Sequence, residues 1–330
     1  MKPAVVAASV LFLSFSAAPV AKADARHVIS QPKKLDAMVK DKRRPVIHVK
    51  RGGWGGAREE DIEHLLAAIA TDLLQHFPGR ELGPISVSPS VHGPVVLYQK
   101  GPRNEYQILL SARGENWAEY VYEFSHELLH VLANYEHHAH DTRHLWFEEM
   151  LGEAVSLHML KRFSNAWRES PPLPQHVSYA GDLSRFTQRA LFAESRRLPR
   201  GVTFEQWFRV NGPILSANPH AREKNDLVAG LFLPLLEHMP DWTAFAHLNA
   251  GQQQAAPSFH EHLLRWYWNT PAEHRQMVVE AMHLFHFTPP DDLAGNAIPA
   301  AASAPAAPAR PLGSEPHLHR HVQQGPQARH

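Results

Sequence analysis

The residues best suited to chemistry in this chain lie together at positions 125–130, in the sequence Ser-His-Glu-Leu-Leu-His. On a helix, residues four positions apart project side by side, so the imidazoles of His126 and His130 can bind one tetrahedral metal ion. A glutamate next to the first histidine can then accept a proton from a water molecule that the metal activates. The segment therefore predicts a metal-dependent hydrolytic site with Glu127 as general base.

Histidine is frequent in this chain, which weakens the pattern taken alone. With 25 histidines and about 22 glutamates, His-Glu-x-x-His is expected by chance roughly 0.13 times in 330 residues. The neighbouring residues strengthen it, because they predict an amphipathic helix over 116–134, with Asn116 and Glu119 as a capping box and Asn134 as a left-handed end. The two histidines face away from the apolar stripe of this helix, toward an expected cleft. The stripe consists of Trp117, Val121, Phe124, Leu128, Val131 and Leu132.

A third metal ligand is expected from the next predicted helix, over 145–163. Glu149 lies on this helix, and three protein ligands with one open position are what hydrolytic zinc requires. Glu153, one turn beyond, is expected to accept the spare N–H of a ligand histidine. Glu148 is a competing ligand, although it projects about 100° away from Glu149. Histidines of the intervening loop, which in a histidine-rich chain are more often solvated, are further alternatives: His137, His138, His140 and His144.

This combination resembles the gluzincin zinc metallopeptidases, in which a glutamate on the following helix completes the site begun by His-Glu-x-x-His. The resemblance covers residues 106–163 and includes Trp146, three positions before Glu149. It implies one Zn²⁺ per chain and a peptide or protein substrate. The Gly-x-Met-Glu-Asn motif of related aminopeptidases is missing, so the choice between endo- and exopeptidase stays open. The roles implied are zinc ligands His126, His130 and Glu149, general base Glu127, and outer partner Glu153.

Two further roles follow from this resemblance. In such enzymes the strand that leads into the motif helix pairs with the extended backbone of the substrate. That role would fall to Ile108, Leu109 and Leu110, for which an ordinary buried strand is an equal alternative. A tyrosine or histidine normally stabilises the oxyanion. The candidates, between which the sequence does not choose, are Tyr179, His176 and His220.

Hydrophobic periodicity predicts that an α+β fold positions these residues. Residues 45–170 are expected to form a zincin-like subdomain with a small mixed sheet and the motif helix. Residues 171–291 are expected to form a mostly helical subdomain, with the cleft between the two. Strands are expected at 46–49, 85–87, 95–98 and 106–110. Helices are expected at about 59–76, 116–134, 145–163, 183–197, 203–210, 225–238, 241–250, 257–268 and 271–286.

The two ends of the chain are expected to lie outside this fold. Residues 1–23 combine Lys2, a short apolar run and Ala-Lys-Ala before Asp24, which is typical of a secretory signal peptide. We therefore expect export to the bacterial periplasm or secretion. Residues 24–44 are expected to be a flexible basic arm. The Ala-, Pro- and His-rich tail, residues 292–330, is expected to be disordered.

Composition limits the alternatives. The chain has no cysteine, which excludes disulfides, iron–sulfur clusters and a cysteine nucleophile. Its formal net charge of zero argues against nucleic-acid binding, and no later apolar run is long enough for membrane insertion. The oligomeric state is not indicated. Two alternatives to an enzyme stay open: a non-catalytic, zincin-like envelope protein that binds metal or a partner, and a helical protein in which the motif is accidental.

Overall fold

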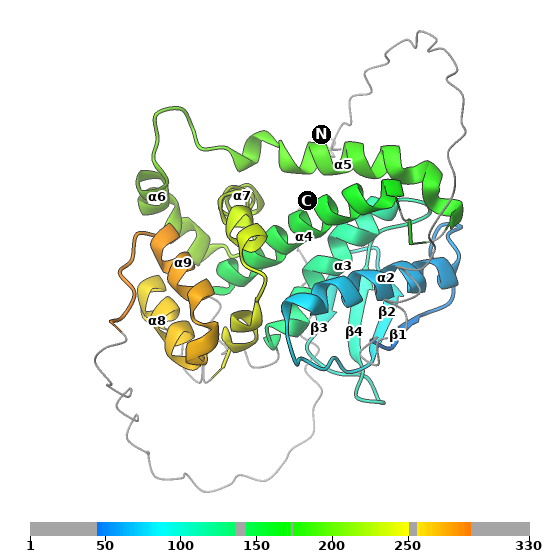
Figure 1. Cartoon of the computed structure of the whole chain (residues 1–330), viewed down its shortest axis with the longest axis horizontal. Coiled ribbons are helices and arrows are strands. Elements are labelled where there is room, and N and C mark those ends of the chain that lie inside the picture. Colours follow the sequence, from blue (N-terminus) through cyan, green and yellow to red (C-terminus); the bar gives the residue numbers. More distant parts are fainter. Residues whose placement is uncertain (1–44, 136–142, 170, 173, 251–255, 292–330) are drawn as a thin grey trace, which may run out of the picture. The chain divides into compact units, whose positions relative to one another are not determined.

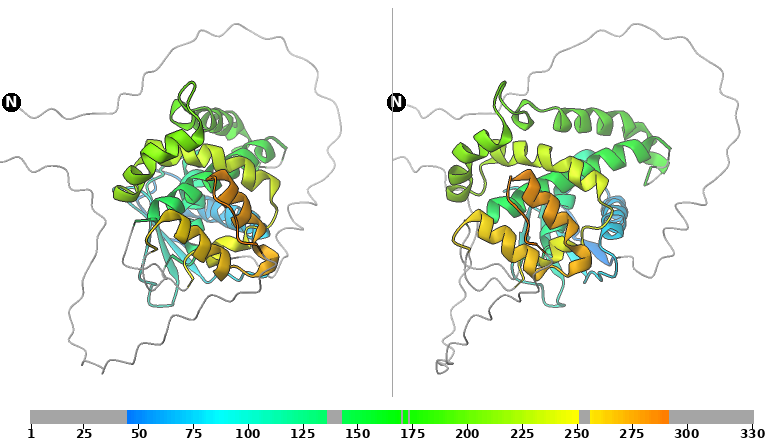
Figure 2. Two further views of the ribbon diagram at one scale, coloured as in Figure 1. Left: turned by 90° about the vertical axis from the view of Figure 1, so that its left-hand side faces the viewer. Right: turned by 60° about the vertical axis from the view of Figure 1, so that its left-hand side comes forward.

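Residues 45–135, 143–169, 171–172, 174–250 and 256–291 are described by the computed structural model of this chain (Figures 1 and 2). The predicted signal peptide, basic arm and tail therefore lie outside the described residues. The same holds for His137, His138 and His140 of the predicted loop.

The four predicted strands form one small mixed sheet. The strands β1 (Ile47–Val49), β2 (Ile85–Pro89), β3 (Val95–Leu97) and β4 (Tyr106–Leu110) lie in the order β1-β2-β4-β3. The pairs β1–β2 and β2–β4 are parallel, whereas β3 is antiparallel to β4. A parallel pair needs a crossover connection, and helix α2 (Glu59–Leu73) supplies it between β1 and β2. β4 is thus an inner strand, and β3 lies at one edge.

Helices make up most of the described chain, and the molecule is a mixed α/β protein. Helix α4 packs against α3, α5 and α7, while α8 and α9 lie at the far end from the sheet (Figure 1). None of the described helices combines the length and the apolar character needed to cross a bilayer. The bounds after α2 are α3 (Trp117–Leu132), α4 (Leu145–Glu169), α5 (Ala180–Leu191), α6 (Phe204–Ala217), α7 (Arg222–His238), α8 (Phe259–Asn269) and α9 (Gln276–Leu284).

Several predicted helices have different ends or a different type. The helix expected at 241–250 is only a short 3₁₀ helix, η5 (Thr243–His247). The large buried side chains in and next to it, Trp242, Phe245 and Leu248, recur every three positions, which suits the 3₁₀ repeat better than the α-helical one. The helix expected at 183–197 spans α5 and then a separate 3₁₀ turn, η4 (Glu194–Arg196).

Of the two predicted end signals of the motif helix, one is confirmed and the other is wrong. Asn116 forms no side-chain cap at the start of α3, so the predicted capping box is wrong. Asn134, just after the helix, has φ of 56° and takes the left-handed conformation that the sequence predicts. All six residues of the predicted apolar stripe are buried.

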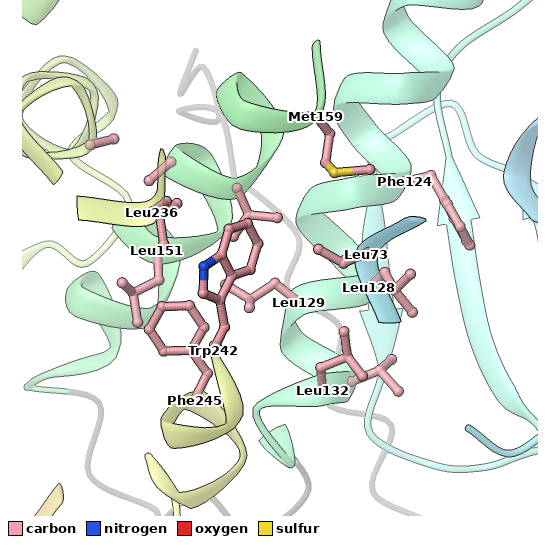
Figure 3. Close-up of a cluster of buried hydrophobic side chains, with 14 of the residues drawn as sticks. Leu73, Phe124, Leu128, Leu129, Leu132, Leu151, Met159, Leu236, Trp242 and Phe245 are labelled. Atoms are coloured by element: carbon pink, nitrogen blue, oxygen red, sulfur yellow. The ribbon is translucent and has the colours of Figure 1, made fainter. Parts of the chain in front are cut away.

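The two regions separated at residue 170 share one hydrophobic core. A single cluster of buried side chains contains residues of the sheet, of α3 and α4, and of the helices that follow. Figure 3 shows Trp242 and Phe245 packed among side chains of α3, α4 and α7. The boundary expected near residue 170 therefore marks a change in the kind of element rather than a gap between two cores.

Two histidines are packed against Trp242 in this core. The ring of His76 is stacked on Trp242 with 3.9 Å between centroids, and His158 of α4 meets both rings edge-on. Burial is the main cause that lowers the pKa of His158, and with the nearby His76 and Arg162 acting in the same direction the pKa is about 4. The Nε2 atoms of both histidines are buried without a hydrogen-bond partner among the described residues. The folded protein therefore holds His158 neutral.

This burial predicts a loss of stability in mild acid. The ordinary histidine pKa is about 6.5, so between that value and the folded value the unfolded chain binds more protons than the folded one. The contribution of His158 to the free energy of unfolding is fully present above pH ~6.5. It is lost, by roughly 3 kcal/mol, as the pH drops toward 4. In His158→Leu the decrease in the free energy of unfolding over this pH range should be smaller by about that amount.

Urea unfolding at several pH values between 4 and 7 measures the effect. Both proteins are kept in a chelator so that release of metal does not contribute. Parallel stability curves for the wild type and His158→Leu would show that His158 does not carry the acid sensitivity.

Candidate metal centre

The close packing of α4 on α3 brings three candidate ligands together. His126 and His130 lie one turn apart on α3, and Glu149 faces them from α4. The Nε2 atom of His126 is 3.5 Å from one Glu149 oxygen, and Nε2 of His130 is 3.7 Å from the other. One ligand atom from each residue lies within 4.8 Å of the other two.

These distances fit a zinc ion. Ligands placed about 2.0–2.1 Å from a tetrahedral zinc are about 3.3 Å from one another, close to the two histidine–glutamate separations found here. The donor set of two imidazole nitrogens and one carboxylate is also a common catalytic zinc set. The side chains of His126 and Glu149 keep 17% and 21% of their surface exposed, so the site is open to solvent on one side.

Glu148 holds the second histidine in place. The Nδ1 atom of His130 is 2.6 Å from Oε1 of Glu148, and both side chains are buried. When Nδ1 carries the proton and donates it to this carboxylate, Nε2 keeps its lone pair for a metal. Glu148 is therefore not a competing ligand in this geometry but an outer partner of one. His130 is 7% exposed, because α4 covers the face of α3 that carries it.

Glu153 does not contact either histidine. Its carboxylate accepts hydrogen bonds from the hydroxyl of Tyr122 and from the guanidinium of Arg196, which also lies 3.5 Å from Asp226. The prediction that Glu153 orients a ligand histidine is therefore wrong, and the acid that bonds His130 is Glu148. The buried charge of Arg196 draws Glu153 toward η4, away from the ligands.

The charges around the site favour a bound cation. Burial lowers the pKa of His130, but its hydrogen bond with Glu148 and the nearby charge of Glu149 raise it to about 10. Burial raises the pKa of Glu149, but the contacts with His126 and His130 prevail and lower it to about 2. The carboxylates of Glu127, Glu148 and Glu149 thus surround the two imidazoles. A divalent cation would balance their negative charge as well as protons on the histidines do.

Glu127 is a buried carboxylate next to the ligands. Burial raises its pKa above the ordinary value, while the neighbouring histidines and a hydrogen bond from the backbone N–H of Val96 act in the opposite direction. A carboxylate with a raised pKa is a better proton acceptor near neutral pH, as a general base requires. The Val96 N–H belongs to β3, so this strand is directed at the motif helix.

The strand expected to bind substrate is the wrong one. β4, with Ile108, Leu109 and Leu110, is hydrogen-bonded to β2 on one side and to β3 on the other. A strand paired on both edges cannot accept another strand. The edge strand next to the motif helix is β3, and the sequence did not indicate this because the order of strands depends on tertiary pairing.

One of the three oxyanion candidates lies beside the ligands. Nδ1 of His220 is 3.9 Å from Glu149, and its side chain is about half exposed. His176 is stacked on Trp117, and Tyr179 packs edge-on against the same ring. Trp117 begins α3, nine residues before His126, which is roughly 13 Å along the helix. His176 is therefore buried in the core and Tyr179 packs against it, both away from the ligands.

Two further residues near the candidate ligands were not predicted from the sequence. Tyr98, just after β3, is half exposed; burial raises its pKa, as do the charges of Glu148 and Glu149. His144, an alternative ligand in the sequence, contacts the carbonyl of Ala256 and is not part of the cluster of candidate ligands. Gly152 gives no sequence signal of its own, yet a Cβ atom there would lie 2.9 Å from the ring of His126.

The comparisons with known proteins give no independent guide to this site. No family model matches the chain, and no curated protein or solved structure matches it either.

The packing at Gly152 yields a test of the metal centre. In Gly152→Ala the added methyl group must displace the His126 ring, so metal affinity should fall by 10-fold or more, as expected when a ligand is misplaced. Alanine is the better helix former by about 1 kcal/mol, so the helix itself should not suffer.

Gly212→Ala is the matched control, because a Cβ atom there makes only an ordinary 3.5 Å contact with Phe208 in α6. Zinc affinity is measured by competition with a chromophoric chelator. Equal affinities for the two variants would mean that the His126 ring is not part of a metal centre.

Proposed function

We propose that this protein is an exported zinc-dependent hydrolase, most simply a metallopeptidase of the gluzincin type. The observation that carries the proposal is the convergence of His126, His130 and Glu149 at one solvent-open point, with Glu127 beside it. The convergence matches the ligand set that the sequence resemblance implies. It also speaks against an accidental motif, because a chance pattern gives no reason for a third ligand from another helix.

The proposed roles of the chain's own residues follow from their positions. A zinc ion held here would polarise a water molecule and the carbonyl of the scissile bond. Glu127 would take a proton from the attacking water at its carboxylate and pass it to the leaving amine. Glu148 would keep the proton of His130 on Nδ1, so that Nε2 stays free to bind metal.

An extended peptide is the substrate that suits the surroundings of this site. β3 is short, lies at the sheet edge and is directed at Glu127 through the N–H of Val96. Leu97 and Tyr98 at its end keep 37% and 50% of their surface exposed. A peptide backbone added along this edge would pass beside the ligands, with apolar contacts to those two side chains. His220 would be the donor available to a developing oxyanion.

Replacing the general base should separate catalysis from metal binding. In Glu127→Gln the side chain keeps its size but cannot accept the proton, so hydrolysis should fall by roughly 10²- to 10⁴-fold. Zinc content should stay near one per chain. The measurements are cleavage of a peptide library and metal analysis on the same purified protein.

Glu119→Gln is the matched control, because it makes the same chemical change on the same helix two turns earlier. Two outcomes would oppose the proposal. Unchanged hydrolysis in Glu127→Gln would remove its role as base. Stoichiometric zinc in a wild-type protein that cleaves no peptide would indicate a metal-binding protein instead of a peptidase.

A further inference from the structure

A buried asparagine reaches the metal centre from the helical second half of the chain. Asn249 follows η5 and is 1% exposed. The segment that carries it is fixed by the core, because Trp242 and Phe245 are buried (Figure 3). In addition, the backbone N–H of Trp242 donates to the carbonyl of His76. Asn249 is thus held in a rigid part of the fold rather than on a loose surface loop.

Both protons of the Asn249 amide are used at the centre. Its Nδ2 donates to the carbonyl of Ala133 at 3.0 Å and to Oε2 of Glu148 at 2.7 Å. Its Oδ1 is buried without a partner among the described residues, so the side chain acts here as a donor. The first bond meets the end of α3, and the second meets the carboxylate that holds His130.

We propose that Asn249 is a positioning residue that orders the metal centre through Glu148. Oε1 of Glu148 receives the Nδ1 proton of His130, and Oε2 receives the proton of Asn249. With a partner on each oxygen, the carboxylate plane is fixed, and with it the direction in which Nε2 of His130 points. A buried carboxylate that loses such a partner turns to find another, which would turn the imidazole too. The inference rests on the proposed zinc function and adds a residue to it.

A second asparagine supplies the control. Asn134 ties the same two segments together, because its Nδ2 donates to the carbonyl of Ala246 and its Oδ1 accepts from Arg80. Its left-handed backbone suits glycine. Asn134→Gly therefore removes contacts between α3 and the η5 segment without touching Glu148. A role in docking alone predicts similar effects of Asn134→Gly and Asn249→Ala on the metal centre.

The experiment compares the full-chain wild type, Asn249→Ala and Asn134→Gly at one fixed pH. The zinc dissociation constant is measured by chelator competition, and the visible absorption bands of the Co²⁺-loaded protein report the ligand geometry. We expect Asn249→Ala to weaken zinc binding about 10-fold and to shift the Co²⁺ bands. We expect Asn134→Gly to leave zinc affinity within about twofold and the bands unchanged, whatever its effect on Tm.

A double-mutant cycle locates the effect. In a Glu148→Ala background both acceptor oxygens are gone, so adding Asn249→Ala should change zinc affinity little. Equal losses in Asn249→Ala and Asn134→Gly, additive losses in the cycle, or unchanged zinc affinity in Asn249→Ala would each overturn the inference.

The outcomes separate this inference from the proposed function. A wild type that binds no zinc would refute both. Zinc binding that depends on Asn249 as described, in a protein without hydrolytic activity, would refute the peptidase and keep the positioning role. Hydrolysis that requires Glu127 but does not change when Asn249 is replaced would refute the positioning role and support the peptidase.

Discussion

The close approach of α4 to α3 is the constraint on which the site depends. His126 and His130 come from one helix and Glu149 from the other, so no local segment of the chain can assemble the set. The absence of a side chain at Gly152 lets α4 lie against the His126 ring. The buried hydrogen bond between His130 and Glu148 crosses the same interface. Packing and polar contacts thus act together at one place.

The same interface explains why acidic residues are tolerated inside the protein. Burying a carboxylate is costly unless it is paired, and each buried acid here has a partner of its own. Glu148 is bonded to His130 and Asn249, and Glu153 to Tyr122 and Arg196. One acid serves the candidate centre, and the other joins α3 and α4 to η4. Two glutamates five positions apart on one helix therefore have different tasks.

Most of the features that the sequence predicted depend on residues that are close to one another in the chain. The four strands and the motif helix follow from periodicity and from residues a few positions apart. The approach of Glu149 to the histidines was expected instead from the ligand set that zinc requires and from the resemblance. The outer partner was assigned to Glu153 because it lies one turn from Glu149, but Arg196 binds that acid and comes from a distant turn. The edge position of β3 and the role of Asn249 depend on tertiary pairing, which local spacing does not encode.

The contacts of Asn249 also bear on the stage of folding at which the candidate metal centre becomes complete. Its bond to Ala133 spans 116 positions of sequence, and its bond to Glu148 spans 101. Closing such long loops costs entropy and comes late when a chain folds. The first half of the chain carries the candidate ligands His126, His130 and Glu149. It lacks Asn249, whose amide bonds Glu148. Completion of the candidate centre would then wait until the last third of the polypeptide is available to fold.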